Sequence, residues 1–88
     1  MKYEIERMFE KDFKKLKDKK LAESILSVIE DVSAAKNIND IKNITKMKGY
    51  SDAYRIHSGN YRIGVIIENN LVIFTAFDHQ KDIYKRFP

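Results

Sequence analysis

The stretch AYRIHSGNYRIGVIIENNLVIFTAF, residues 53–77, decides the fold that this sequence predicts. It holds three runs rich in Ile, Val, Tyr and Phe, which are residues that favour β-strands. The runs cover residues 53–58, 61–68 and 71–77. Gly59-Asn60 and Asn69-Asn70 separate them, and both residue types tolerate the positive φ angles of two-residue hairpin turns. The stretch therefore predicts an antiparallel meander of three strands.

Hairpin pairing assigns each side chain of this meander to one of two faces. A two-residue loop at Gly59-Asn60 pairs His57 with Arg62, and directly paired residues share a face. The face expected to form the core carries Tyr54, Ile56, Ile63, Val65, Ile67, Val72, Phe74 and Ala76. The outer face carries Arg55, His57, Arg62, Gly64, Ile66, Leu71, Ile73, Thr75 and Phe77.

The outer face of the meander has two ends of different character. Its basic end holds Arg55, His57 and Arg62. We expect His79 and Lys81 to join this end from the tail, and Phe77 to lie roughly opposite Arg62. The apolar end holds Ile66, Leu71 and Ile73. Exposed apolar side chains beside a basic cluster indicate a surface that a partner covers.

The residues before the meander predict a strand and two helices. Residues 2–7 alternate apolar and charged side chains, which indicates a short strand. Apolar residues at helical spacing then form two stripes. The first stripe is Phe9, Phe13 and Leu16, and the second is Leu21, Ile25, Val28, Ile29 and Val32. Asp18-Lys19-Lys20 makes the turn between them, so we expect an antiparallel helical hairpin.

Residues 33–46 show a weaker pattern, rich in turn-forming Asn and Asp. Ile38, Ile41 and Ile44 are expected to pack under the core. Together these patterns predict an α+β fold in a single domain, 1–88. An N-terminal strand leads into the antiparallel helical hairpin, which packs on one face of a twisted antiparallel β-sheet. A chain of 88 residues supports one thin core.

Composition limits the partners and the compartment of the chain. It contains no cysteine, which excludes disulfides and thiolate zinc sites. No apolar run approaches the length of a membrane span, and the first residues lack the apolar core of a signal peptide. We therefore expect a cytoplasmic protein that does not contact the membrane.

The formal net charge is +4, and the basic excess lies in the second half of the chain. Residues 45–88 carry seven Lys or Arg against four Asp or Glu. An uneven basic surface favours a polyanionic partner, usually nucleic acid, and a solvated lysine-rich surface is the alternative. The helical lysines from Lys11 to Lys20 are expected to form a solvated face, with a second RNA or ribosome contact as the other option.

The polar residues fit metal-free cleavage of RNA. No metal-binding motif, glycine-rich phosphate loop or serine nucleophile signature is present, so we expect no cofactor. In such cleavage the RNA 2′-hydroxyl attacks the adjacent phosphate, while the protein stabilises charge and moves protons. Arg62 and Arg55 suit the charge role, and His79 or His57 can move protons. Tyr84 can stack on an unpaired base or hydrogen-bond to the 2′-hydroxyl, and for each of these residues a structural role is the alternative.

Four short motifs carry a resemblance to a known family. They are Lys46-Met47-Lys48-Gly49, Tyr54-Arg55-Ile56, Gly59-Asn60-Tyr61-Arg62-Ile63 and His79-Gln80-Lys81-Asp82-Ile83-Tyr84. In this order and spacing the chain resembles the RelE/ParE superfamily of toxins from type II toxin–antitoxin systems. The resemblance implies two helices packed on a twisted antiparallel sheet. In the RelE-like branch it implies a ribosome-dependent mRNA endonuclease that a cognate antitoxin neutralises.

The resemblance also implies roles for single residues and partners. It matches Arg62 to the arginine that contacts the scissile phosphate, and Arg55 and His57 to basic positions on the preceding strand. His79 and Tyr84 match positions that are often histidine and tyrosine. We expect three lysines to contact RNA: Lys48, Lys81 and Lys85. The expected partners are the antitoxin and mRNA on the ribosome, with operator DNA bound only through the antitoxin complex.

The chain departs from the family pattern at Gln80, where arginine is usual, and glutamine cannot supply a permanent positive charge. Gly64 and Val65 also stand in place of bulkier residues. Three functions therefore stay open: an mRNA endonuclease, a ParE-like toxin that inhibits DNA gyrase, and a degenerate relative that only binds antitoxin. The basic face, His79 and Tyr84 favour the endonuclease.

Overall fold

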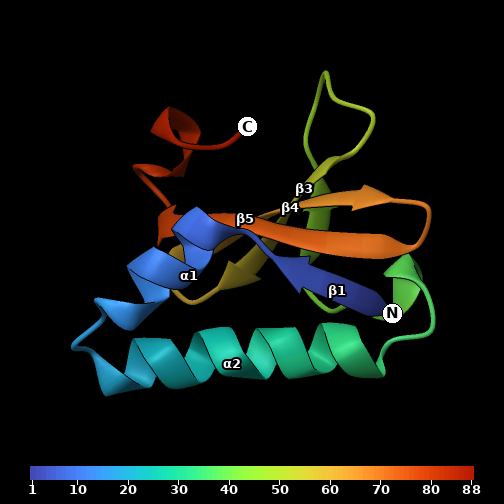
Figure 1. The fold of residues 1–88 in the computed structure, drawn as a ribbon. Helices are drawn as coiled ribbons and strands as arrows, with labels where there is room; N and C mark the ends of the chain where they lie inside the picture. Colours follow the sequence, from blue (N-terminus) through green and yellow to red (C-terminus); the bar gives the residue numbers. More distant parts are fainter.

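The computed structural model describes residues 1–88 (Figure 1). Its strands are β1 (Lys2–Ile5), β2 (Ile44–Lys46), β3 (Ala53–Ser58), β4 (Tyr61–Glu68) and β5 (Leu71–His79). Its helices are α1 (Arg7–Lys14) and α2 (Lys19–Ala34), and short 3₁₀ turns lie at Ile38–Asp40 and Ile83–Lys85. No helix is both long enough and apolar enough to cross a lipid bilayer.

All five strands form one sheet in the spatial order β1-β5-β4-β3-β2. The predicted meander of β3, β4 and β5 is antiparallel, and His57 pairs with Arg62 as expected. β1 pairs with β5 in parallel, so the sheet is mixed: the predicted antiparallel pairing holds for β2 to β5 and is wrong at the β1 edge. Because no hairpin joins β1 to β5, the local sequence does not fix their relative direction. The patterns also miss β2, since three residues are too few to show alternation.

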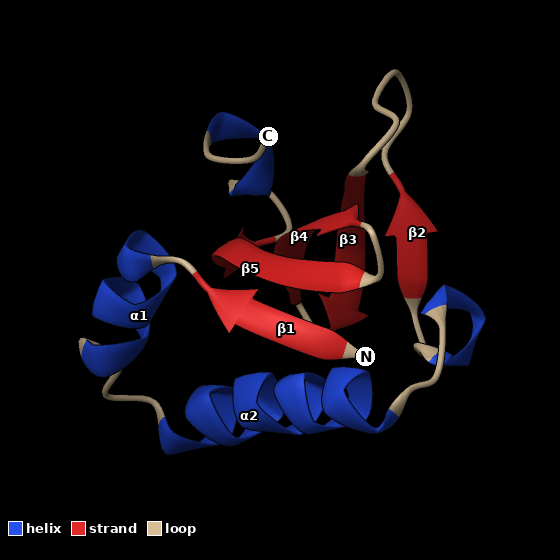
Figure 2. Ribbon diagram, turned by 45° about the vertical axis from the view of Figure 1, so that its right-hand side comes forward, coloured by secondary structure: helices blue, strands red, loops and turns tan.

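Both helices lie on one face of the sheet, and a short turn joins them (Figure 2). The two predicted helices are therefore present, but α2 runs at a wide angle to α1 instead of packing antiparallel along it. α2 begins at Lys19 because the Asp18 carboxylate accepts a hydrogen bond from the Leu21 backbone N–H and caps the helix. Its buried stripe consists of Leu21, Ile25, Ile29 and Val32. These side chains join Phe9 of α1 and the inner face of the sheet in the main hydrophobic core.

A β-bulge interrupts the pairing of β4 with β5 between Gly64 and Val65. Val65 pairs with Phe74, whereas Gly64 pairs with Ala76, which leaves Thr75 as an extra residue in β5. Because side chains alternate between faces, one extra residue exchanges the two faces for the rest of the strand.

The bulge overturns two predictions for the end of β5. Phe77 was expected on the outer face opposite Arg62, but it is buried in the main core, 5.1 Å from Phe9 between ring centroids. Ala76 was expected in the main core, but it faces the other side of the sheet. Asp78 takes the position opposite Arg62.

The tail of the chain covers the outer face of the sheet and forms a second, smaller core there. This tail core consists of Met47, Ala53, Ala76, Ile83 and Phe87. Ile66 is half-buried against it. The prediction of an exposed apolar end at Ile66, Leu71 and Ile73 is therefore wrong for Ile66, which the tail partly covers, and Leu71 and Ile73 are half-buried.

The ring of Phe87 lies directly against the backbone of Gly64. A Cβ atom at position 64 would sit 2.4 Å from two carbons of that ring, which is closer than real contacts allow. Gly64 is therefore needed for close approach of the tail, and this explains the departure from the bulkier residue of the family pattern.

Gly64→Ala is expected to lower the free energy of unfolding by about 1–3 kcal/mol, because the Phe87 ring must move off the sheet. Equilibrium unfolding in urea would measure the change. In a Phe87→Ala background the obstacle is gone, so the same substitution should cost less than about 0.5 kcal/mol. Equal costs in the two backgrounds would contradict this account.

Candidate functional site

A shallow polar pocket opens on the outer face of the sheet, with a volume of about 310 Å³. Its lining consists of Asn43, Thr45, Arg55, His57, Arg62 and Tyr84. Arg55 and His57 come from β3, Arg62 comes from β4 and Tyr84 comes from the tail. Four of the five residues that the sequence singled out for catalysis thus meet in one pocket from three separate segments.

Three hydrogen bonds hold the Arg62 guanidinium in place. Its Nη1 donates to the carbonyl oxygens of Gly59 at 3.0 Å and Tyr61 at 2.9 Å. Its Nη2 donates to the Gln80 side-chain oxygen at 3.0 Å. A guanidinium carries five N–H groups, so Nε–H and one N–H of Nη2 are left to bind a ligand. Arg62 is half-buried, and its planar fork matches the oxygens of a phosphate.

Arg55 and Tyr84 form a second pair in the pocket. The Arg55 Nη1 donates a hydrogen bond to the Tyr84 hydroxyl, and its Cζ lies 5.1 Å from the centroid of the Tyr84 ring. Tyr84 remains 64% exposed, so much of its ring is open to a stacking partner. A positive charge beside an exposed aromatic ring suits a phosphate and an unpaired base bound side by side.

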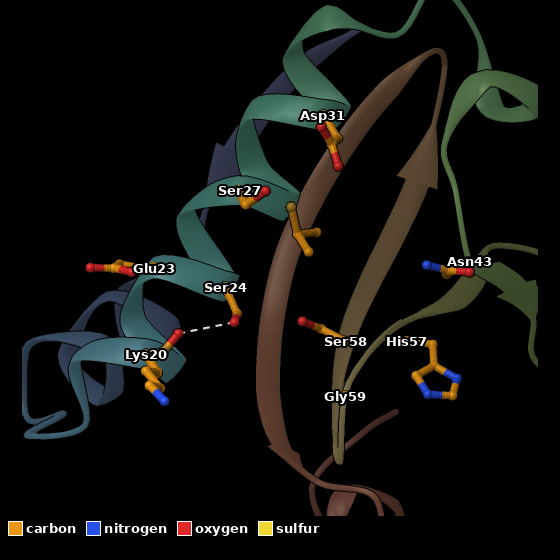
Figure 3. A pocket seen from close by; sticks show the side chains of 10 residues that line it. Lys20, Glu23, Ser24, Ser27, Asp31, Asn43, His57, Ser58 and Gly59 are labelled. Atoms are coloured by element: carbon orange, nitrogen blue, oxygen red, sulfur yellow. Dashed lines mark hydrogen bonds between the residues drawn. The ribbon is translucent and has the colours of Figure 1, made fainter.

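His57 is exposed between this pocket and a larger open groove, which has a volume of about 780 Å³ (Figure 3). The groove runs between α2 and the turn of the first hairpin. Its other lining residues are Lys20, Glu23, Ser24, Ser27, Val28, Asp31, Asn43, Ser58 and Gly59. The imidazole is therefore accessible to a ligand from both sides.

His79 does not enter the pocket, contrary to the expectation from sequence. It pairs with Tyr61, and the two rings lie 5.7 Å apart between centroids. Tyr61 packs against the main core, so His79 lies on the helix side of the sheet. The β5 bulge causes this placement, because it turns His79 away from Arg62 and brings Gln80 toward Arg62 instead.

The three lysines expected to contact RNA are exposed and lie outside the pocket lining: Lys48, Lys81 and Lys85. The Lys85 ammonium lies 3.7 Å from the Asp82 carboxylate, in an ion pair that is open to solvent. Lys48 belongs to the loop between β2 and β3. The lysines therefore do not form part of the pocket lining.

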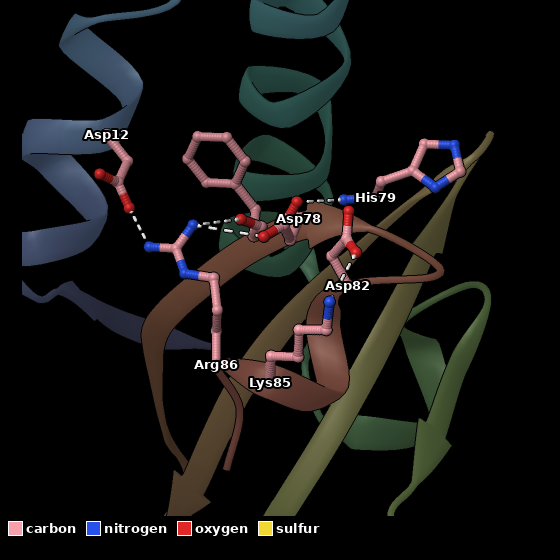
Figure 4. A network of polar contacts seen from close by, with 7 residues as sticks. Asp12, Asp78, His79, Asp82, Lys85 and Arg86 are labelled. Atoms are coloured by element: carbon pink, nitrogen blue, oxygen red, sulfur yellow. Dashed lines mark hydrogen bonds and ion pairs between the residues drawn. The ribbon is translucent and has the colours of Figure 1, made fainter.

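A polar network fastens the tail beside the pocket (Figure 4). Arg86 donates a hydrogen bond to the Asp12 carboxylate of α1, and its Nη1 lies 3.5 Å from the Asp78 carboxylate. The same Nη1 donates to the Phe77 carbonyl oxygen at 3.4 Å. The hydrogen bond that Arg86 donates to Asp12 raises the pKa of Arg86, and the charges of Asp12 and Asp78 raise it further against the opposing effect of burial. Arg86 is thus the permanently charged centre of this network.

Sequence reasoning missed three residues of this region. Thr45 lies on β2 and Asn43 directly precedes that strand, which the patterns do not predict. Arg86 joins Asp12 across 74 positions of the chain, and a contact that distant leaves no periodic signal. The one local sign in the sequence is the richness in turn-forming Asn and Asp before β2. In the structure Asn43 has the positive φ angle, 62°, that such residues tolerate.

Known proteins resemble this chain along its length. The family described as "ParE toxin of type II toxin-antitoxin system, parDE" matches residues 3–84. The toxin RelE3 of Methanocaldococcus jannaschii is 38% identical over 89 residues, which covers 100% of each chain.

Solved structures resemble the fold. A chain in the RelB–RelE antitoxin–toxin complex from Methanococcus jannaschii has a TM-score of 0.76 and 36% identity, over 96% of this chain and 98% of that one. The isolated RelE toxin of E. coli has a TM-score of 0.66 over 96% of this chain and 90% of its own. Its identity is 15%, so this second likeness concerns the fold alone.

Substitutions at two neighbouring tail residues should distinguish a residue of the site, Tyr84, from a residue that supports the fold, Ile83. Tyr84→Phe should change the free energy of unfolding by less than about 0.5 kcal/mol, because the side chain is 64% exposed. Ile83→Ala should cost about 2–5 kcal/mol, because Ile83 is fully buried in the tail core. Urea denaturation of both variants would test this, and a large loss for Tyr84→Phe would mean that Tyr84 is a structural anchor.

Proposed function

Because this chain belongs to the ParE toxin family of type II toxin–antitoxin systems, we propose that it is a toxin that cuts mRNA on the ribosome. The observation that carries the proposal is the convergence of Arg55, His57, Arg62 and Tyr84 in one pocket. Two of these residues supply permanent positive charge, one supplies an imidazole, and one supplies an exposed aromatic ring. Cleavage of RNA through its own 2′-hydroxyl needs charge stabilisation and proton transfer, which the arginines and the imidazole can supply, while the ring can hold a base.

In the proposed reaction the 2′-oxygen attacks the adjacent phosphorus and the 5′-oxygen of the next nucleotide leaves. The products are a 2′,3′-cyclic phosphate and a free 5′-hydroxyl. Arg62 offers two unused N–H groups to the phosphate oxygens, where negative charge grows in the transition state. Arg55 adds a second positive charge and holds Tyr84, on whose ring a base can stack.

Two protons must move in this reaction, one from the 2′-hydroxyl and one to the 5′-oxygen. His57 is the imidazole that lines the pocket, so the proposal assigns both transfers to it: neutral His57 takes the 2′-hydroxyl proton, and protonated His57 gives that proton to the 5′-oxygen. His79 lies on the other side of the sheet and receives no direct part. Lys48, Lys81 and Lys85 are proposed to bind phosphates that flank the cleaved one.

Gln80 acts on Arg62 in this proposal rather than on the RNA. Its side-chain oxygen accepts a hydrogen bond from Nη2 and so orients the guanidinium. It adds no charge of its own. The pocket therefore holds two arginines, Arg55 and Arg62, where the family pattern predicts a third at position 80.

The proposed partners are a cognate antitoxin and the ribosome with its mRNA, in the cytoplasm where translation takes place. Support for the antitoxin comes from the similar chain at 36% identity, which was solved in an antitoxin–toxin complex. We propose that operator DNA is bound only through the antitoxin complex. The name of the matching family keeps inhibition of DNA gyrase as the second candidate function.

Expression of the toxin alone in bacteria, followed by mapping of mRNA 5′ ends, would test the proposal. We expect new ends within translated codons. Arg62→Ala should reduce their yield by about 100-fold or more, because it removes the donors to the scissile phosphate. Arg7→Ala is the matched control, since Arg7 is an exposed arginine on α1. Growth arrest with intact mRNA and altered DNA supercoiling would instead support inhibition of gyrase.

The chemistry has its own test in vitro. Ribosomes programmed with an mRNA that carries a single 2′-deoxy nucleotide before the cleaved bond should resist the toxin completely, because the attacking hydroxyl is missing. The unmodified mRNA should yield a 2′,3′-cyclic phosphate. Cleavage of the deoxy mRNA at the same bond would show that water or a protein group is the nucleophile.

A further inference from the structure

We infer that Arg86 is a positioning residue, which holds Tyr84 in register with Arg55 by tying the tail to Asp12 of α1 and Asp78 of β5. The inference rests on the proposed function for its catalytic consequence. Its structural part stands on the contacts of the tail alone, so the two can fail separately.

Tyr84 cannot fix its own place in the pocket. Its side chain is 64% exposed, and its hydrogen bond is to Arg55, itself a flexible side chain. The ring therefore depends on the residues around it in the tail for its position.

The buried apolar residues of the tail hold it against the sheet but do not fix its rotation. Ile83 and Phe87 are buried on either side of Tyr84, at 0% and 1% exposure. Phe87 rests against Gly64, where a Cβ atom would block it. Apolar contacts are non-directional, so they press the tail against the sheet without specifying its rotation.

Arg86 supplies the directional contacts that the apolar anchors lack. Its guanidinium reaches Asp12, Asp78 at 3.5 Å and the Phe77 carbonyl oxygen at 3.4 Å. The side chains of Arg86, Asp12 and Asp78 are 38%, 22% and 26% exposed, so solvent screens them less than an open surface pair. Figure 4 shows the guanidinium between α1 and the end of β5.

The backbone of the tail transmits this position to Tyr84. The N–H groups of Arg86 and Phe87 both donate to the Ile83 carbonyl oxygen, at 3.0 and 2.8 Å. The Lys85 N–H donates to the Asp82 carbonyl oxygen at 3.0 Å. Residues 82–87 thus form one tight turn, and a rotation at Arg86 moves Tyr84 with it. Lys85 lies on the same turn with a side chain that is 80% exposed. Its ion pair is with Asp82 of that turn, so it does not tie the tail to the rest of the protein.

A double-mutant cycle with Tyr84→Ala tests the inference on programmed ribosomes under single-turnover conditions. Arg86→Gln should slow cleavage about 10-fold when Tyr84 is present, because a misplaced catalytic group loses rate steeply. In the Tyr84→Ala background it should slow cleavage by less than about twofold, since the ring that it positions is absent. Asp12→Asn should act in the same direction with a smaller effect, because Asp78 remains. Equal losses in both backgrounds would overturn the inference.

Two control variants match these substitutions on α1. Arg7→Gln removes an exposed arginine, and Glu10→Gln removes an exposed carboxylate that pairs only with Lys14, at 3.5 Å. Both should leave the cleavage rate unchanged. A loss of cleavage rate in Arg7→Gln as large as that in Arg86→Gln would mean that the net charge of the protein, and not the position of the tail, sets the rate. That result would overturn the inference.

Amide hydrogen exchange gives a readout that does not need nuclease activity. Arg86→Gln should speed exchange at the Lys85, Arg86 and Phe87 amides at least about 10-fold, and should leave the β4 amides unchanged. Unchanged exchange in the tail would overturn the inference even if cleavage slows. If the wild-type protein does not cut mRNA, the proposed function fails, and the exchange result alone decides whether Arg86 holds the tail.

Discussion

The bulge between Gly64 and Val65 is the constraint on which the arrangement of the pocket depends. One extra residue in β5 reverses the side-chain alternation of that strand over its last positions. It buries Phe77 under the helices and turns His79 to the same side. It also brings Gln80 to Arg62.

Gly64, beside the bulge, also determines how the tail packs on the outer face of the sheet. Gly64 carries no side chain, so the outer face of the sheet is flat enough for the Phe87 ring to lie on it. That contact closes the tail core and places Tyr84 within reach of Arg55. The strands supply a rigid base for Arg55, His57 and Arg62, whereas the aromatic member of the site lies on a segment that must be fastened separately.

The sequence predicts most of the fold because its turns and stripes are local signals. The Gly59-Asn60 and Asn69-Asn70 loops fix both hairpins, and in the structure Gly59, Asn69 and Asn70 have the positive φ angles that such turns need. The bulge leaves no such sign, because both faces of the third strand are apolar and either register satisfies the pattern. No local pattern predicts the contact between Asp12 and Arg86 either, since it joins two charged residues at opposite ends of the chain. Local patterns therefore predict Arg55, His57 and Arg62 in the pocket, and they misplace His79.

The parallel pairing of β1 with β5 has a consequence for how the protein is made. It joins Lys2–Ile5 to Leu71–Phe74, so the sheet closes only when residues from both halves of the chain are present. Pairings between such distant residues carry a large loop-closure entropy and slow the folding of a domain. While the chain is being synthesised, β1, α1 and α2 emerge before the four strands β2 to β5 that make up the rest of the sheet. Folding is therefore completed late in synthesis, and the residues of the pocket come together only after β5 and the tail have left the ribosome.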